Sequence, residues 1–283
     1  MKLQYLGTAA AEAWPGLFCN CPQCEAARKL GGKNIRTRSQ AVIYADKVGE
    51  GEPDDILLID LPPDTYLHCL QHGLRLDKVG HLLITHSHDD HLCATELQYR
   101  CGIFANPVPE FPLCVYGNDK VKKYIDDALP DLQKWPTGIE YNLLEPFKPY
   151  KAGVYTVTAL LALHDRTEQC FIFMIEHNGK RMLYGNDTGI FPEETWEYIV
   201  GKEFDLISLD CTSGILKEGT NHMGLPDAIE VEKLLNKIGC LKADTKIVLH
   251  HFSHNGGAYH DDFVARAKPY GFDVSYDGGI WDI

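Results

Sequence analysis

The segment that most constrains this chain is Thr-His-Ser-His-Asp-Asp-His at residues 85–91, which follows directly on the apolar run HLLIT. Three imidazoles and two carboxylates in six residues are hard to explain by packing, and both groups bind Zn²⁺, Mn²⁺ or Fe²⁺. In an extended backbone His86 and His88 project to the same side and can share one ion. Asp90 and His91 follow a change of backbone direction and can reach a second ion. The segment therefore predicts a metal site at the end of a buried strand.

Further candidate ligands stand where other predicted strands give way to loops, which is where sites are commonly built. His164 ends VTALLALH, Asp187 lies in YGNDTG, and His222 lies in TNHMG before a predicted helix. Three more histidines, His250, His251 and His254, end or follow the strand KIVL. Their recurrence at successive strand ends favours one shared site. The remaining histidines lack such a context and are interpreted as ordinary ones: His68, His72, His81, His177 and His260.

Short apolar runs separated by turn residues predict many strands, and periodic segments predict fewer helices. The strands are expected at 1–7, 40–46, 55–61, 80–85, 113–117, 154–163, 170–177, 181–185, 205–210 and 246–251. The clearest helix is expected at 227–239, with weaker helical patterns at 24–30, 91–101, 119–130 and 261–269. Two sheets with helices outside them accommodate this α/β mixture. We expect a single domain over residues 1–283.

Charge and composition limit the classes of partner. The formal net charge of −13 disfavours long nucleic acids, although bound metals can still attract a small anion. Nothing in the sequence is long and apolar enough to span a membrane, and the first residues do not resemble a signal peptide. We therefore expect a cytoplasmic protein whose partner is a small molecule, for which a small anion remains open, rather than a long nucleic acid, and we allow for a homodimer.

Three of the ten cysteines, Cys19, Cys21 and Cys24, stand within six residues. Three thiolates and one imidazole form a closed tetrahedral zinc site of the structural kind. Free thiols, a disulfide or a redox Cys-x-x-Cys pair are the alternatives, but the third cysteine favours zinc. The other seven cysteines have apolar neighbours and are interpreted as buried thiols.

The motif His86-x-His88-x-Asp90-His91, followed by a separate His, Asp and His, resembles the ligand set of the metallo-β-lactamase superfamily. The resemblance covers nearly the whole chain and implies a four-layer αββα sandwich with the metals at one edge. It implies the following roles: His86, His88 and His164 for the first metal, Asp90, His91 and His251 for the second, Asp187 bridging both, and Asp60 supporting the site.

Adding the cysteine cluster makes the chain most similar to the phosphoribosyl cyclic phosphodiesterase branch of this superfamily, which carries a structural zinc. The similar segments are GTAAAEAWPGLFCNCPQC, NHMGLPDAIE and LHHFSH. The resemblance implies that His254 is the fourth zinc ligand. It also implies that His251, rather than His250, is the active-site metal ligand at the end of this strand. It further implies that His222 protonates the leaving group. Residues 100–150 carry no motif that matches this branch.

The resemblance implies a binuclear enzyme that holds two Zn, Mn or Fe ions and opens a small phosphodiester, cyclic ones included, by attack of a bridging hydroxide. Alternatives within the superfamily are a thioester hydrolase of the glyoxalase kind, a tRNA-processing nuclease and a pyrroloquinoline-quinone biosynthesis relative. The last can keep the zinc cysteines while altering the active-site ligands, which here all are present. A non-enzymatic, zinc-stabilised binding module leaves most of the motifs unexplained.

Overall fold

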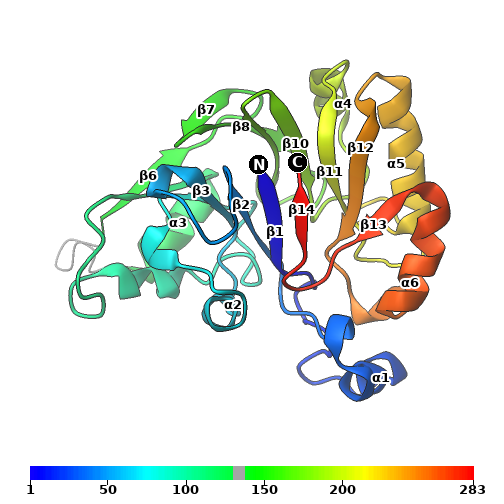
Figure 1. The fold of residues 1–283 in the computed structure, drawn as a ribbon, viewed down its shortest axis with the longest axis horizontal. Coiled ribbons are helices and arrows are strands. Elements are labelled where there is room, and N and C mark those ends of the chain that lie inside the picture. The colour runs from blue at the N-terminus through cyan, green and yellow to red at the C-terminus, as the bar shows by residue number, and fades with distance from the viewer. Residues whose placement is uncertain (130–137) are drawn as a thin grey trace.

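The computed structural model describes residues 1–129 and 138–283, which form two mixed sheets of seven strands each (Figure 1). The first sheet has the order β14 (Ile280–Asp282), β1 (Lys2–Gly7), β2 (Gln40–Tyr44), β3 (Ile56–Ile59), β4 (His81–Leu83), β5 (Leu113–Gly117) and β6 (Ile139–Leu143). The second has the order β13 (Phe272–Val274), β12 (Leu241–His250), β11 (Phe204–Asp210), β10 (Lys180–Gly185), β9 (Phe171–His177), β8 (Tyr155–Leu161) and β7 (Pro149–Ala152). The termini lie side by side because β14 pairs with β1.

The two sheets pack face to face through alternate side chains of their strands. In β3, Leu57 and Ile59 enter the core between the sheets, whereas Leu58 packs on the outer face. In β9, Phe171 and Phe173 likewise point between the sheets. Successive side chains of a strand face opposite sides, so strands that are buried on both faces need nearly continuous apolar sequence.

Helices cover both outer faces, which gives four layers (Figure 1). The first sheet is covered by α2 (Thr65–His72), a 3₁₀ helix at Ala94–Arg100 and α3 (Asp119–Ala128). The second is covered by α1 (Pro22–Leu30), α4 (Glu193–Ile199), α5 (Leu225–Lys237) and α6 (His260–Ala267). The predicted αββα sandwich is confirmed.

The predicted strands all occur, with ends that differ by a few residues, and β12 begins five residues earlier than expected. The helices predicted near 24, 119, 227 and 261 also occur, although residue 130 of the second lies outside the described residues. The helix predicted after His91 is a 3₁₀ helix that begins only at Ala94. The sequence analysis missed α2, α4, β6, β7, β13 and β14, whose patterns are short or largely exposed.

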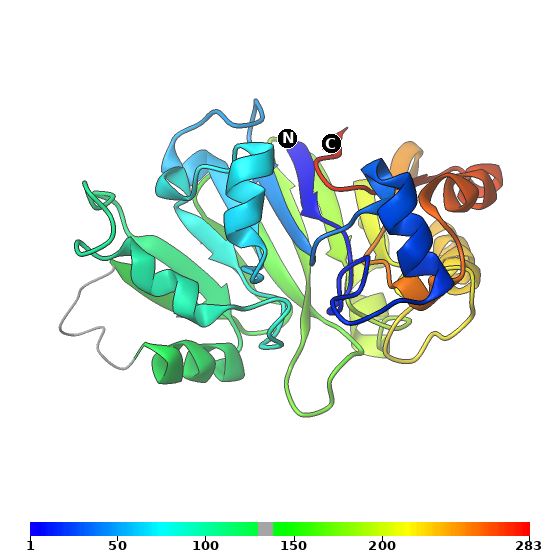
Figure 2. The same ribbon diagram turned by 90° about the horizontal axis from the view of Figure 1, so that it is seen from below.

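One edge of the sandwich collects the carboxyl ends of strands from both sheets. β3, β4 and β5 run parallel in one sheet, and β10, β11 and β12 run parallel in the other. β8 points the same way as β10, because both are antiparallel to β9 between them. Figure 2 views the molecule from below, the side on which α1 lies in Figure 1. Within the described residues, no helix combines the length and the apolar character needed to cross a membrane.

Candidate active site

The loops after β4, β8 and β10 bring His86, His88, His164 and Asp187 together. Nε2 of His86 lies 2.9 Å from Nδ1 of His88, which in turn lies 3.2 Å from Nε2 of His164. Oδ2 of Asp187 lies 3.3 Å from Nε2 of His86. These four residues are the set that the sequence resemblance assigned to the first metal together with its bridge.

A second group, Asp90, His91 and His251, forms on the other side of Asp187. Nε2 of His91 lies 3.0 Å from Oδ2 of Asp187 and 3.3 Å from Oδ2 of Asp90. Nε2 of His251 lies 3.4 Å from Nε2 of His91 and 3.8 Å from Oδ2 of Asp187. Asp187 therefore stands between both groups, as the resemblance implies for a bridging ligand.

The donor atoms of both groups fit divalent cations. Around a tetrahedral ion with bonds of about 2.0–2.1 Å to nitrogen, neighbouring donor atoms are about 3.3 Å apart. The distances of 2.9–3.4 Å between most neighbouring donors match this edge. Asp187 Oδ1 is buried and makes no well-aligned hydrogen bond with the described residues. Burial alone raises the pKa of Asp187, but the surrounding histidines, led by His251, hold it well below its usual value.

Asp60 supports this arrangement from the end of β3. Its Oδ2 accepts a hydrogen bond of 2.7 Å from Nδ1 of His91, and its Oδ1 accepts one of 2.9 Å from the backbone of Thr85. The second nitrogen of a ligating histidine is commonly held by a carboxylate in this way, which orients the ring. The backbone is left-handed at three of these positions, with φ of 65° at Asp60, 55° at Asp187 and 64° at His251.

His222 lies beside Asp187, in the segment before α5. Its Nδ1 lies 3.1 Å from Oδ1 of Asp187 and donates a hydrogen bond of 3.4 Å to Oδ2 of Asp210. Burial disfavours the charged imidazole, but the two carboxylates outweigh it and raise the pKa of His222 to about 11. Because Nδ1 faces the carboxylates, Nε2 is the nitrogen left for a ligand.

Asp210, at the end of β11, is a residue that the sequence analysis missed. It accepts hydrogen bonds from the backbone of Asp187, at 3.1 Å, and of Met223, at 2.8 Å. It also accepts a 3.0 Å bond from Oγ1 of Thr212, which lies 2.8 Å from Nδ1 of His251. A signal existed, because DLISLD ends on an aspartate just as DILLID ends on Asp60.

The loop after β8 supplies two more residues that the sequence analysis missed. Asp165 Oδ2 lies 3.3 Å from Nε2 of His88, so the second nitrogen of this ring also faces a carboxylate. Glu168 accepts hydrogen bonds from the backbone and the hydroxyl of Ser87, at 3.1 and 2.8 Å. These contacts fix the His86–His88 turn against the β8–β9 loop.

The structure separates the two neighbouring histidines at the end of β12. His250 is fully buried, and its two ring nitrogens lie 3.0 Å from the hydroxyls of Ser39 and Ser275. Both nitrogens are thus engaged away from the ligand groups. His251 turns into the site, where it lies beside Asp90, His91 and Asp187.

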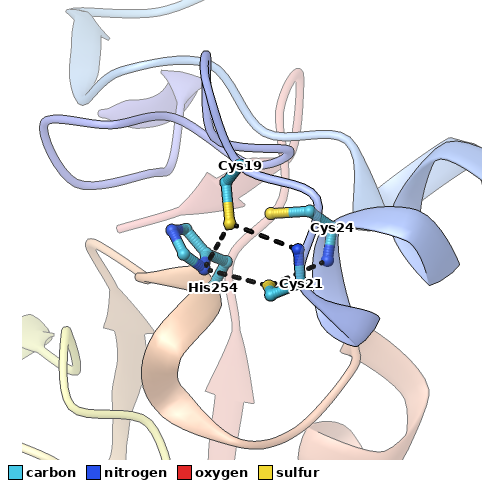
Figure 3. A group of neighbouring side chains, drawn as sticks. All are labelled: Cys19, Cys21, Cys24 and His254. Carbon is cyan, nitrogen blue, oxygen red and sulfur yellow. Dashed lines mark hydrogen bonds between the residues drawn. The ribbon is translucent and has the colours of Figure 1, made fainter.

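Cys19, Cys21, Cys24 and His254 form a separate cluster next to α1 (Figure 3). Nδ1 of His254 lies 3.5 Å from Sγ of Cys21 and 4.0 Å from Sγ of Cys19. A hydrogen bond from the Cys24 backbone lowers the pKa of the Cys21 thiol to about 6, which favours the thiolate form that binds metals. Thiolate and imidazole at such distances fit a tetrahedral zinc ion.

The ligand groups open into a cavity of about 470 Å³. It is lined by Ala10, Ala11, Glu12, Thr212, His222, Ser253, His254 and Asn255 together with several of the proposed ligands. A hollow of about 370 Å³ adjoins it, shares His88 and His164, and contains Arg166 and Asn221. Two larger hollows of the described surface contain none of the ligand groups, so size alone does not mark the site.

Two sheets between helices, with groups of potential metal ligands converging at one edge, define an αββα sandwich with a candidate metal centre. Residues 57–252 match the beta-lactamase superfamily domain, and the chain belongs to this superfamily. Its members are in general hydrolases with metal sites. The predicted superfamily is therefore confirmed.

Relatives cover nearly the whole chain at low identity. Coenzyme PQQ synthesis protein B of Acinetobacter baumannii (strain ACICU) is 22% identical over 98% of this chain and 98% of its own length. A solved diphosphatase from the PhnP family has a TM-score of 0.76 and 17% identity, covering 100% of this chain and 97% of that one. Zn²⁺-bound PqqB from Methylobacterium extorquens has a TM-score of 0.74 and 19% identity, covering 100% of both chains. At these identities the structural likeness shows the fold.

Proposed function

We propose that this protein is a metal-dependent phosphodiesterase that hydrolyses a small phosphodiester, cyclic ones included, to a monoester. The observation that carries the proposal is the position of His222. Its Nδ1 is held by Asp187 and Asp210, and its ring lines the same cavity as both ligand groups. A proton donor beside two cation sites suits a reaction in which an alkoxide leaves, as in phosphodiester hydrolysis. The thiolate that leaves in thioester hydrolysis is less basic and needs a proton less.

The residues divide into three roles in this proposal. His86, His88 and His164 would hold one cation, Asp90, His91 and His251 would hold the other, and Asp187 would serve as a ligand to both. When bound, divalent ions supply Lewis acidity for the charge that builds up on the phosphoryl oxygens and make water easier to deprotonate. His222 holds a proton at Nε2 for the leaving oxygen, while Asp60 and Asp210 keep the rings in place.

The surroundings of the site favour an anionic substrate over a neutral thioester. Arg166 is exposed and forms no hydrogen bond or ion pair with the described part of the chain. The neighbouring carboxylate of Asp165 does not pair with this guanidinium. Its oxygens lie 2.7 and 2.8 Å from donors of Thr167 and 3.3 Å from Nε2 of His88. The guanidinium is therefore available to an anion beside the ligand groups.

A second candidate follows from the match to coenzyme PQQ synthesis protein B, which spans 98% of this chain. In that case the protein contributes to making this cofactor. The complete pair of ligand groups and His222 favour the hydrolase. A tRNA-processing nuclease is less compatible with the net charge of −13, because phosphate backbones require positive surface.

The test is a substrate panel with metal analysis of the same sample. We expect turnover of cyclic and linear phosphodiesters and little turnover of a thioester or a precursor tRNA. Loss of activity with a chelator, followed by recovery with Zn²⁺ or Mn²⁺, should accompany it. Thioester turnover without diester turnover would contradict the proposal.

A further inference from the structure

Two loops from opposite ends of the chain form one wall of the active-site cavity. Ala10, Ala11 and Glu12 follow β1, and Ser253, His254 and Asn255 follow β12. The backbone of Ala10 donates a hydrogen bond of 3.0 Å to Phe252, which in turn donates one of 2.9 Å to Thr8. The wall is therefore a paired structure rather than two loose loops.

Glu12 is the acidic residue of the cavity lining that belongs to neither ligand group. Its side chain is about one-third exposed (34%), and its Oε1 accepts a hydrogen bond from Oγ of Ser253. Its other oxygen, Oε2, has no hydrogen-bond partner among the described residues. A carboxylate oxygen in a cavity wall is thus left for a ligand.

The cysteine cluster fixes the position of Glu12. Nδ1 of His254 faces the cysteine sulfurs (Figure 3), and Nε2 of the same ring lies 3.6 Å from Oε1 of Glu12. The loop is tied down further on, where the backbone of Gly16 donates to Sγ of Cys24 at 3.2 Å and Leu17 donates to the carbonyl of Glu12 at 3.3 Å. A side chain at Gly16 would approach the His254 ring to about 3.2 Å, so the loop passes directly over it. Glu12 is therefore held from both sides.

We propose that Glu12 is a specificity residue, whose carboxylate accepts a hydrogen bond from a hydroxyl of the substrate and repels a second anionic group. The preferred ligand then carries a neutral, hydroxyl-bearing group, such as a sugar or a polyol, next to its phosphate. The inference rests on the proposed function, which supplies the phosphate group of the ligand. Glu12 selects among ligands by contacting the organic group that the phosphate carries. A hydrogen bond to a charged acceptor corresponds to about tenfold or more in affinity.

The test measures binding of three phosphate monoesters to the metal-loaded enzyme by calorimetry. Glycerol phosphate carries hydroxyls, propyl phosphate carries none, and 2-carboxyethyl phosphate carries a second anion. We expect the wild type to bind glycerol phosphate about tenfold tighter than propyl phosphate, and carboxyethyl phosphate most weakly. Glu12→Ala should reduce the glycerol preference to within about twofold.

Glu12→Gln separates charge from hydrogen bonding. The amide oxygen still accepts from Ser253 and from a hydroxyl, so the fold and most of the glycerol preference should remain. Binding of carboxyethyl phosphate should improve about tenfold, because the repulsion is gone. A merely structural role of Glu12 would shift the three affinities together and leave their ratios unchanged.

Glu25→Gln is the matched control. Like Glu12→Gln, it replaces one negative carboxylate by a neutral amide near the cysteine cluster. The Glu25 side chain is exposed, pairs with Arg28 at 2.6 Å and does not line the cavity. Its three affinities should equal those of the wild type, and all variants should keep the wild-type zinc content. The inference would be overturned if Glu12→Gln left the affinity for carboxyethyl phosphate relative to propyl phosphate unchanged, or if Glu12→Ala kept the full glycerol preference. Absence of diester hydrolysis in the wild type, with these ratios as expected, would instead overturn the proposed function.

Discussion

Asp60, Asp187 and His251 share a left-handed backbone, which is unfavourable for residues other than glycine. Asp60 and His251 stand directly after β3 and β12, and Asp187 stands two residues after the end of β10, where the chain turns toward the common edge. Such conformations cost about 1–3 kcal/mol each and persist only where the surrounding structure imposes them. Their coincidence with two proposed ligands and one supporting carboxylate indicates that the site geometry outweighs local backbone preference.

At the residue scale the first prediction concerns the bridge. Because Oδ2 of Asp187 lies within 3.8 Å of donor atoms of both groups, Asp187→Ala should abolish activity and reduce the metal content by more than one ion. Asp89→Ala is the control, since this exposed motif residue faces Tyr124 and belongs to neither group. Elemental analysis decides the matter, and a folded Asp187→Ala protein with its full metal content would show that Asp187 is no bridge.

The second prediction concerns His222 as a proton donor. A sugar alkoxide leaves poorly without a proton, whereas p-nitrophenolate leaves readily. His222→Ala should therefore lower kcat on a sugar-derived diester by about 10²–10⁴-fold and cost far less on a p-nitrophenyl diester. Metal content should not change. Steady-state kinetics on both substrates make the comparison, and equal losses would remove His222 from the mechanism while leaving the ligand groups intact.

At the scale of elements, α1 depends on the cysteine cluster at its beginning. Cys21 is the N-cap of this helix, and its side chain accepts from the backbone of Cys24. The fourth member, His254, follows β12 by a few residues on the loop that also carries His251. A zinc ion held by this cluster would therefore join the loop after β1 to the loop after β12.

The third prediction follows from this connection. Cys21→Ser should lose one tightly bound zinc and lower Tm by about 5 °C or more, because metal binding contributes directly to folding. Cys93→Ser, outside the cluster, should leave both quantities unchanged. Thermal unfolding with zinc analysis measures this. Wild-type Tm and zinc content in Cys21→Ser would contradict a structural zinc site.

At the scale of the whole molecule, stability comes from three apolar layers, of which the layer between the sheets is the most enclosed. Tyr5 spans this layer, because its hydroxyl on β1 lies 2.6 Å from that of Ser208 on β11. The two halves of the site stand on different sheets, with His86 and His91 on one and Asp187 and His251 on the other. Separation of the sheets would therefore dismantle both ligand groups.

The fourth prediction tests this layer. Phe173 is fully buried between the sheets, so Phe173→Ala should lower the free energy of unfolding by about 3–5 kcal/mol. Phe18 is fully exposed, and Phe18→Ala should change it by no more than about 0.5 kcal/mol. Urea unfolding of both variants gives the comparison. Equal effects would mean that the layer is not the main source of stability.

The sequence by itself determined the strands around the site, because side chains alternate between the two faces of a strand with a period of two residues. It also determined the motif of residues 86–91, because residues close in sequence are necessarily close in space. The prediction of one domain over the whole chain stays a prediction.

Only the tertiary structure decided which distant residues meet. His164, Asp187, Asp210 and His251 are separated by up to 87 positions, and no local pattern measures the distances between them. They converge because their strands end at the same edge of one sheet, facing the loop after β4 of the other. The same packing engages His250 with two serines, turns His251 into the site and places Glu12 in the cavity wall. Side-chain direction at a strand end depends on the partners across the edge, and these exist only in the folded chain.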